Sequence, residues 1–166
     1  MRGIDCPLPP ALAFLPPAKP EHHPALIAAY GVPEEPEPGL LAEPRHVEAV
    51  HLILLKPDGS GKADVGRPKI SIGSHAGLAI VLAPPNDLLG LAIAEGIEDA
   101  LSVHAATGLG AWAAGGATFM PALAAHVPSY IECVTVVVDD DNAGHRSADE
   151  LASRLNQRAL QVEFWG

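Results

Sequence analysis

Residues 133–144 read CVTVVVDDDNAG, an unbroken apolar run that ends in three carboxylates. Residues 88–96, LLGLAIAEG, have the same form, because they are apolar up to Glu95. Helical patterns follow these two runs, at residues 97–108 and 147–159. Continuous apolar strands that alternate with helices are typical of a parallel sheet covered on both faces. The sequence therefore predicts an α/β fold for this half of the chain. Shorter strands are expected at residues 111–116 and 160–165.

The first half of the chain divides where the proline content changes. Eleven of the 17 prolines lie in the first 44 residues, and proline lacks the N–H donor that regular structure needs. We expect residues 1–45 to form an extended, irregular strap that lies on the domain. Residues 46–87 contain three short strand patterns separated by turns, which predict a small antiparallel β subdomain with a basic loop. The α/β domain then occupies residues 88–166.

Charge and cysteine content exclude several classes of protein. The 166 residues carry 10 Lys and Arg against 20 Asp and Glu, a formal net charge of −10. A generally basic nucleic-acid-binding surface is excluded, so contacts with phosphates must be local or carried by metal ions. Cys6 and Cys133 are too few for a disulfide framework or a four-cysteine zinc site. With no long apolar run, we expect a cytoplasmic protein without a membrane partner.

Carboxylates follow two of the predicted strands at the point where each strand ends. Glu95 follows one strand, and Asp139 and Asp141 follow another. Because the carboxyl ends of parallel strands meet at one edge of a sheet, these side chains are expected to meet there, with Asp99 one helical turn beyond Glu95. Residues 70–145 contain eight acids and no Lys or Arg to compensate them. Clustered carboxylates without a protein cation favour a hard divalent metal, Mg²⁺ or Mn²⁺.

These segments resemble a known family. EGIED (95–99) and DDDNAG (139–144) are similar to the Toprim domain, which has Glu-Gly after its first strand and Asp-x-Asp-x-x-Gly after its third. WAAGGATFM (112–120) resembles the family's second strand, glycine turn and helix, so the resemblance covers residues 88–166. KPDGSGKADVGRPKISIG (56–73) is similar to the segment before the Toprim domain in phage- and plasmid-type DNA primases. The resemblance implies a Rossmann-like sheet and a role in the DNA replication of a phage or mobile element.

The resemblance also implies a metal-dependent nucleotidyltransferase. By this resemblance, Glu95 is a general base or metal ligand, Asp139 and Asp141 hold the metal, and Asp99 supports the metal from the first helix. Metal ions of this kind stabilise the attacking and leaving oxygens of an in-line displacement while a carboxylate assists proton transfer. Gly96 and Gly144 stand where the backbone turns tightly or lets a phosphate approach.

Cationic residues gather in the basic loop of the β subdomain. Lys62, Arg67 and Lys69 are expected to hold a triphosphate or the template backbone opposite the carboxylates, although a solvated turn explains the same pattern equally well. The expected partners are a single-stranded DNA template and nucleoside triphosphates. Primases of this kind use a zinc-binding module upstream and a helicase module downstream. The chain would have to obtain these modules from another chain or a missing segment.

Two further functions remain open on the sequence. The same four acids would serve a Toprim metal-dependent nuclease, with water in place of the ribose hydroxyl. A non-catalytic nucleic-acid-binding or assembly module would use the acids only to hold metal and phosphate. Templated primer synthesis is the preferred prediction, because the segment before the Toprim-like region resembles that of primases.

Overall fold

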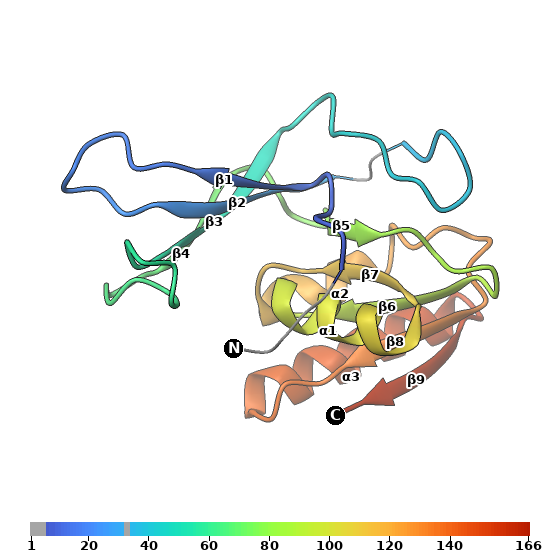
Figure 1. Cartoon of the computed structure of the whole chain (residues 1–166). Helices are drawn as coiled ribbons and strands as arrows, with labels where there is room; N and C mark the ends of the chain where they lie inside the picture. The colour runs from blue at the N-terminus through green and yellow to red at the C-terminus, as the bar shows by residue number, and fades with distance from the viewer. Residues whose placement is uncertain (1–5, 32–33) are drawn as a thin grey trace.

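The computed structural model describes residues 6–31 and 34–166, which form two sheets stacked one above the other (Figure 1). The N-terminal sheet is antiparallel, with the order β1-β2-β3-β4. Its strands are β1 (Leu12–Leu15), β2 (Ala25–Ala29), β3 (Ala49–Leu54) and β4 (Lys69–Gly73). A basic hairpin, residues 55–68, joins β3 to β4.

The expectation of an irregular strap is wrong for residues 12–15 and 25–29, which form strands, although it holds for the loop between them. Residues 12–15 and 25–29 pair with each other as β1 and β2, and β2 pairs along its whole length with β3. The prolines of this region stand outside the strands, with Pro10 before β1, Pro16 after it and Pro24 before β2. Proline at a strand end removes no hydrogen bond from the ladder, so the proline content does not prevent sheet formation.

The C-terminal sheet is mixed and mostly parallel, with the order β5-β7-β6-β8-β9. Its strands are β5 (Ile80–Ala83), β6 (Gly90–Ala94), β7 (Gly110–Ala113), β8 (Cys133–Val137) and β9 (Gln161–Trp165). Only β5 runs antiparallel, beside β7. The expected meander of residues 46–87 is therefore divided, because β5 belongs to this sheet and not to the N-terminal one.

Helices cover both faces of the C-terminal sheet, as the continuous apolar strands predict. The helices are α1 (Ile97–Thr107), the short η1 (Ala117–Phe119) and α2 (Met120–Leu123), and α3 (Asn142–Gln157). Ala92 and Ala94 of β6 face α1 and the N-terminal sheet, whereas Leu91 and Ile93 face α2 and α3. Successive strand residues point to opposite faces, so one strand contributes to two hydrophobic cores. The predicted α/β fold is confirmed.

The two sheets share one of these cores. Leu12, Ala28 and Tyr30 of the N-terminal half pack in the same buried cluster as α1 and the small side chains of β6 and β7. The backbone continues the contact, since the N–H of Gly31 donates to the carbonyl of Ala79 over 2.9 Å just before β5. None of the helices in the described part of the chain combines the length and apolar character needed to cross a bilayer.

Candidate active site

The carboxyl ends of β6 and β8 bring Glu95, Asp139 and Asp141 to one edge of the C-terminal sheet, here called the acid edge. β6 and β8 are parallel neighbours, with Ile93 opposite Val136. Glu95 follows the last residue of β6 directly, and Asp139 follows β8 after a single intervening valine. The chain needs no long loop to bring these carboxylates together, because the strand register already does so.

The pKa of Glu95 is affected by the other two carboxylates of the acid edge. Glu95 is half-buried, and this burial is the main cause of a pKa raised above the ordinary value. The negative charges of Asp139 and Asp141 and a side-chain hydrogen bond with Asp139 raise the pKa further, while Lys69 of β4 lowers it. Like charges at short range favour protonation unless a cation compensates them. The single described cation that acts on Glu95 comes from the N-terminal sheet.

Asp141 has a structural role as well as a place at the acid edge. It is the N-cap of α3, and its Oδ1 accepts hydrogen bonds from the backbone N–H groups of Ala143 at 2.8 Å and Gly144 at 2.7 Å. These two bonds hold the pKa of the exposed carboxyl below its usual range. Oδ2 takes part in neither bond. The aspartate that starts the helix therefore keeps one carboxylate oxygen outside these two cap bonds.

The structure places Asp99 differently from the other acids. Gly96 is the buried N-cap of α1, and a methyl group on it would lie 3.1 Å from Oδ2 of Asp99. The carboxylate thus folds back over the first turn of α1, where the positive end of the helix dipole favours an anion. Asp99 therefore lies beside the acid edge and is not part of it, whereas Glu95, Asp139 and Asp141 form the edge.

The donor set of the acid edge fits a hard divalent cation. Carboxylate oxygens are the ligands of Mg²⁺ and Mn²⁺. Burial is the main cause of the raised pKa of Glu95, and repulsion from Asp139 and Asp141, which such a cation would relieve, adds to it. Across residues 6–31 and 34–166, no three His, Cys, Asp or Glu side chains converge as a preformed metal cage. Mg²⁺ usually keeps several waters and binds through one or two carboxylates together with substrate phosphates. Glu95, Asp139 and Asp141 would hold such an ion in that open manner.

The predicted phosphate-binding cations lie on the basic hairpin and at the start of β4. Nζ of Lys62 lies 3.4 Å from Oε1 of Glu98 in the first turn of α1, so this ion pair joins the hairpin to the C-terminal half. Nζ of Lys56 lies 3.1 Å from Oδ2 of Asp64 within the hairpin itself. Arg67 is exposed. Lys62 is therefore paired with the first turn of α1, and the charge of Lys69 lowers the pKa of both Glu95 and Glu98.

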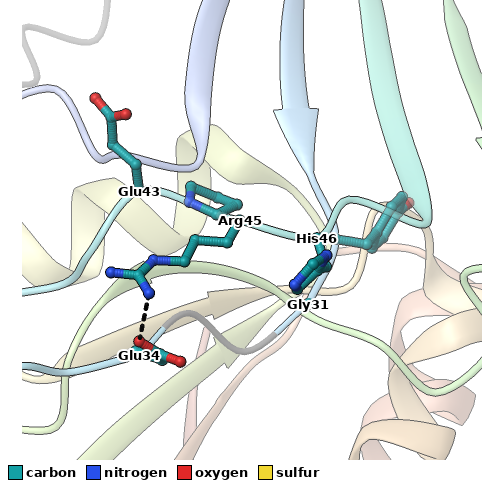
Figure 2. A pocket seen from close by; sticks show the side chains of 7 residues that line it. Gly31, Glu34, Glu43, Arg45 and His46 are labelled. Atoms are coloured by element: carbon teal, nitrogen blue, oxygen red, sulfur yellow. Dashed lines mark ion pairs between the residues drawn. The ribbon is translucent and has the colours of Figure 1, made fainter.

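A cavity of about 130 Å³ lies elsewhere, between the end of β2 and the loop that leads to β3. Figure 2 shows the guanidinium of Arg45 reaching toward Glu34, with Nη1 and Oε2 4.0 Å apart. Both side chains are largely exposed, so the pair contributes little stability. The described lining of this cavity comes wholly from the N-terminal half: Tyr30, Gly31, Glu34, Glu43, Pro44, Arg45 and His46.

Sequence reasoning missed a set of side chains between the two sheets, which we call the junction cluster: Tyr30, His51, Ser71 and His75. They come from the end of β2, from β3, from β4 and from the segment after it. The available signal for His51 was its place inside the apolar run AVHLIL, and the structure puts it on the buried face of β3. No local signal identified Tyr30, because its partners are distant in the sequence.

Comparison with known families agrees with this geometry. Residues 90–164 match the family model described as Toprim domain. Residues 1–82 match a second family model, described as a domain of unknown function (DUF7146). Neither the curated proteins nor the solved structures contain a match to the chain. Toprim domains generally bind Mg²⁺ and carry out metal-dependent phosphoryl transfer on nucleic acids. The residues that match the Toprim domain model therefore include the whole acid edge.

Proposed function

We propose that this chain joins nucleotides on a single-stranded DNA template, as a metal-dependent nucleotidyltransferase of the primase kind. The observation that carries the proposal is that Lys69, a cation on β4 of the N-terminal sheet, lowers the pKa of Glu95 at the acid edge. A site that holds both a polyanionic template and a triphosphate needs cations facing its metal-binding carboxylates. The N-terminal sheet supplies that cation to the acid edge, because residues 70–145 contain no Lys or Arg.

Glu95 has the properties of a proton acceptor in this reaction. The pKa of its half-buried carboxyl is raised toward neutral pH. The carboxylate is therefore a better base than that of an exposed glutamate. Asp139 and Asp141 remain to hold the cation, and Asp99 supports them from α1. The metal, when bound, would polarise the phosphoryl oxygens and stabilise the charge that develops on them.

The basic hairpin completes the proposed site. Lys62 and Arg67 would contact template or triphosphate phosphates from the hairpin, which the Lys62–Glu98 ion pair joins to α1. Lys69 would add its charge from β4, where it already lowers the pKa of Glu95. Phosphate contacts position a strand without reading its sequence. We expect a site that accepts templates of varied sequence, with affinity that falls as salt concentration rises.

The first experiment is calorimetric titration of Mn²⁺ and Mg²⁺ into the full chain and into the Asp139→Asn/Asp141→Asn double variant. Saturable binding by the wild type alone is expected, because the amides keep the shape of the carboxylates but lose their charge. Equal affinity in both proteins would overturn the assignment of the metal ligands. The N-cap role of Asp141 is retained by asparagine, so loss of folding does not confuse the result.

The second experiment separates synthesis from cleavage. The full chain is incubated with unlabelled single-stranded circular DNA, labelled nucleoside triphosphates and Mg²⁺ or Mn²⁺, and a parallel reaction uses end-labelled DNA. Labelled products longer than a dinucleotide, absent with Glu95→Gln, are expected. Shortening of the end-labelled DNA without synthesis would replace the proposal with a nuclease. Metal and DNA binding without either reaction would replace it with a non-catalytic module.

A further inference from the structure

Tyr30 lies at the point where the N-terminal sheet meets the Toprim domain. Its side chain is only 2% exposed. Its backbone N–H donates to the carbonyl of Ala49 over 3.0 Å, and the next residue forms a bridge to Ile80 of β5. Tyr30 is therefore held by both halves of the chain.

The hydroxyl of Tyr30 belongs to a closed polar triangle. It is hydrogen-bonded to Oγ of Ser71 at 3.2 Å and lies 3.5 Å from Nδ1 of His51, while Ser71 and His51 are 3.0 Å apart. His51 and Ser71 are register partners on β3 and β4. Burial lowers the pKa of His51 to about 4, so the imidazole is neutral at neutral pH. The N-terminal sheet thereby fixes the direction of the phenol.

That hydroxyl reaches the glycine turn of the Toprim domain. A methyl group on Gly115 would lie 2.1 Å from the Tyr30 oxygen, so the hydroxyl packs directly on the bare backbone there. Gly115 has φ +75°, a conformation that favours glycine. Its N–H donates to the carbonyl of Glu95 over 2.9 Å. One residue of backbone thus separates the Tyr30 hydroxyl from Glu95.

Two further aromatic rings, those of His75 and Phe119, connect Tyr30 to the other side of the same turn. The ring of His75 stacks on Tyr30 with centroids 4.9 Å apart and an interplanar angle of 16°. The ring of Phe119 meets His75 edge to face at 4.4 Å. Phe119 in turn packs over Gly116, where an added methyl group would lie 3.3 Å from its ring. The Gly115–Gly116 turn is thus held between Tyr30 and Phe119.

We propose that Tyr30 is a positioning residue for Glu95: its hydroxyl, fixed by Ser71 and His51, holds the Gly115–Gly116 turn and through it the backbone of Glu95. The N-terminal segment is then part of the Toprim site, although it supplies no metal ligand. The proposal rests on the proposed function, because it takes Glu95 as a residue of the metal-dependent site. Residues that orient metal ligands contribute to metal affinity without touching the ion.

The test compares Tyr30→Phe with Tyr130→Phe in the full chain. The first variant removes the buried hydroxyl and keeps the ring, while the second makes the same chemical change at an exposed tyrosine. Mn²⁺ affinity, measured calorimetrically with the metal alone, should fall about tenfold in Tyr30→Phe, as for other groups that support metal ligands. Nucleotide incorporation should show a lower kcat with an unchanged KM for the triphosphate. Tyr130→Phe should match the wild type in both.

Melting temperature separates positioning from a simple loss of packing. The hydrogen bond between Ser71 and His51 remains after Tyr30→Phe, so neither buried polar group loses its last partner. We therefore expect a melting temperature close to that of the wild type. Ser71→Ala, which removes one partner of the hydroxyl, should lower Mn²⁺ affinity in the same direction. Lower melting temperature with unchanged Mn²⁺ affinity and kcat would overturn the positioning role. Failure of the wild type itself to bind Mn²⁺ would overturn the proposed function and the positioning role together.

Discussion

Gly144 packs against the backbone of Asp139, so closely that a methyl group at Gly144 would stand 2.6 Å from the Asp139 carbonyl oxygen and 2.9 Å from its Cβ. Asp139 lies in the connection between β8 and α3, and Gly144 lies in the first turn of α3, which Asp141 caps. The last position of the Asp-x-Asp-x-x-Gly motif is therefore a steric requirement. Glycine lets the first turn of α3 approach the aspartate that stands at the acid edge.

Gly144→Ala is expected to displace Asp139. Because the contact is with backbone atoms, it cannot be relieved by a side-chain rotation, and overpacking of this kind costs about 1–3 kcal/mol. Mn²⁺ affinity should fall together with the free energy of unfolding. Gly61→Ala is the matched control, since an added methyl group there meets nothing within 4 Å. Wild-type metal affinity in Gly144→Ala would contradict the role given to Asp139.

Substitutions of Asp141 should separate its two roles. Asp141→Asn keeps an oxygen that accepts from the N–H groups of Ala143 and Gly144, so the melting temperature should change little. Mn²⁺ affinity should fall at least about tenfold, because the charge is lost. Asp141→Ala should lose both the metal and the helix cap, and it should melt at a lower temperature than Asp141→Asn. Equal melting temperatures for the two variants would show that the cap contributes nothing.

Glu95→Gln should stabilise the metal-free protein at neutral pH. The pKa of Glu95 is raised in the folded chain, so the folded state holds this proton more tightly than the unfolded state does. Stability is therefore lost as the pH rises above the ordinary glutamate value of about 4.3. Glutamine does not titrate, and its advantage should shrink as the pH is lowered toward that value.

Thermal unfolding without metal, measured over a pH series for wild type and Glu95→Gln, checks this expectation. Saturating Mn²⁺ should abolish or reverse the advantage of glutamine, because the ion stabilises the ionised carboxylate. An advantage that is independent of pH would indicate a packing effect and would remove the electrostatic explanation.

The ion pair between Lys62 and Glu98 predicts a gain in DNA affinity. In the free protein Glu98 holds the Lys62 ammonium at 3.4 Å, so a phosphate must compete with this carboxylate. Glu98→Gln should tighten binding of a labelled single-stranded oligothymidylate about two- to fivefold, the size expected for a partly exposed ion pair. Fluorescence anisotropy at fixed salt concentration measures the change.

A double-mutant cycle distinguishes this competition from a general change in charge. In a Lys62→Gln background, Glu98→Gln should bring no further gain, because the residue for which phosphate and carboxylate compete is absent. Glu150→Gln is the charge-matched control, since Glu150 pairs with Arg154 on α3. Equal gains from Glu98→Gln with and without Lys62 would refute the competition.

Local patterns in the sequence were enough to predict the C-terminal half. The apolar runs that end at Glu95 and Asp139 predicted both the parallel strands and the edge where their acids meet. This succeeds because a carboxylate directly after a strand is positioned by the strand itself. The buried faces of β6 and the helices that cover it follow from the same alternation of side chains.

The N-terminal half could not be predicted to the same extent, and the reason lies in long-range pairing. Proline content suggested an irregular strap, although the prolines stand at strand ends and leave β1 and β2 free to pair. Nothing local to residues 77–83 distinguishes a strand of one sheet from a strand of the other. The choice of β5 for the C-terminal sheet depends on β7, which lies further along the chain.

The sequence by itself determined the α/β class, the order of the strands along the chain and the acids that stand at their ends, because each depends on neighbouring residues. Only the tertiary structure decided that Lys69 acts on Glu95, that Lys62 pairs with Glu98 and that the Tyr30 hydroxyl packs on Gly115. Each of these interactions joins the N-terminal half of the chain to the C-terminal half. Such contacts depend on how two separately formed layers pack, which no local propensity encodes.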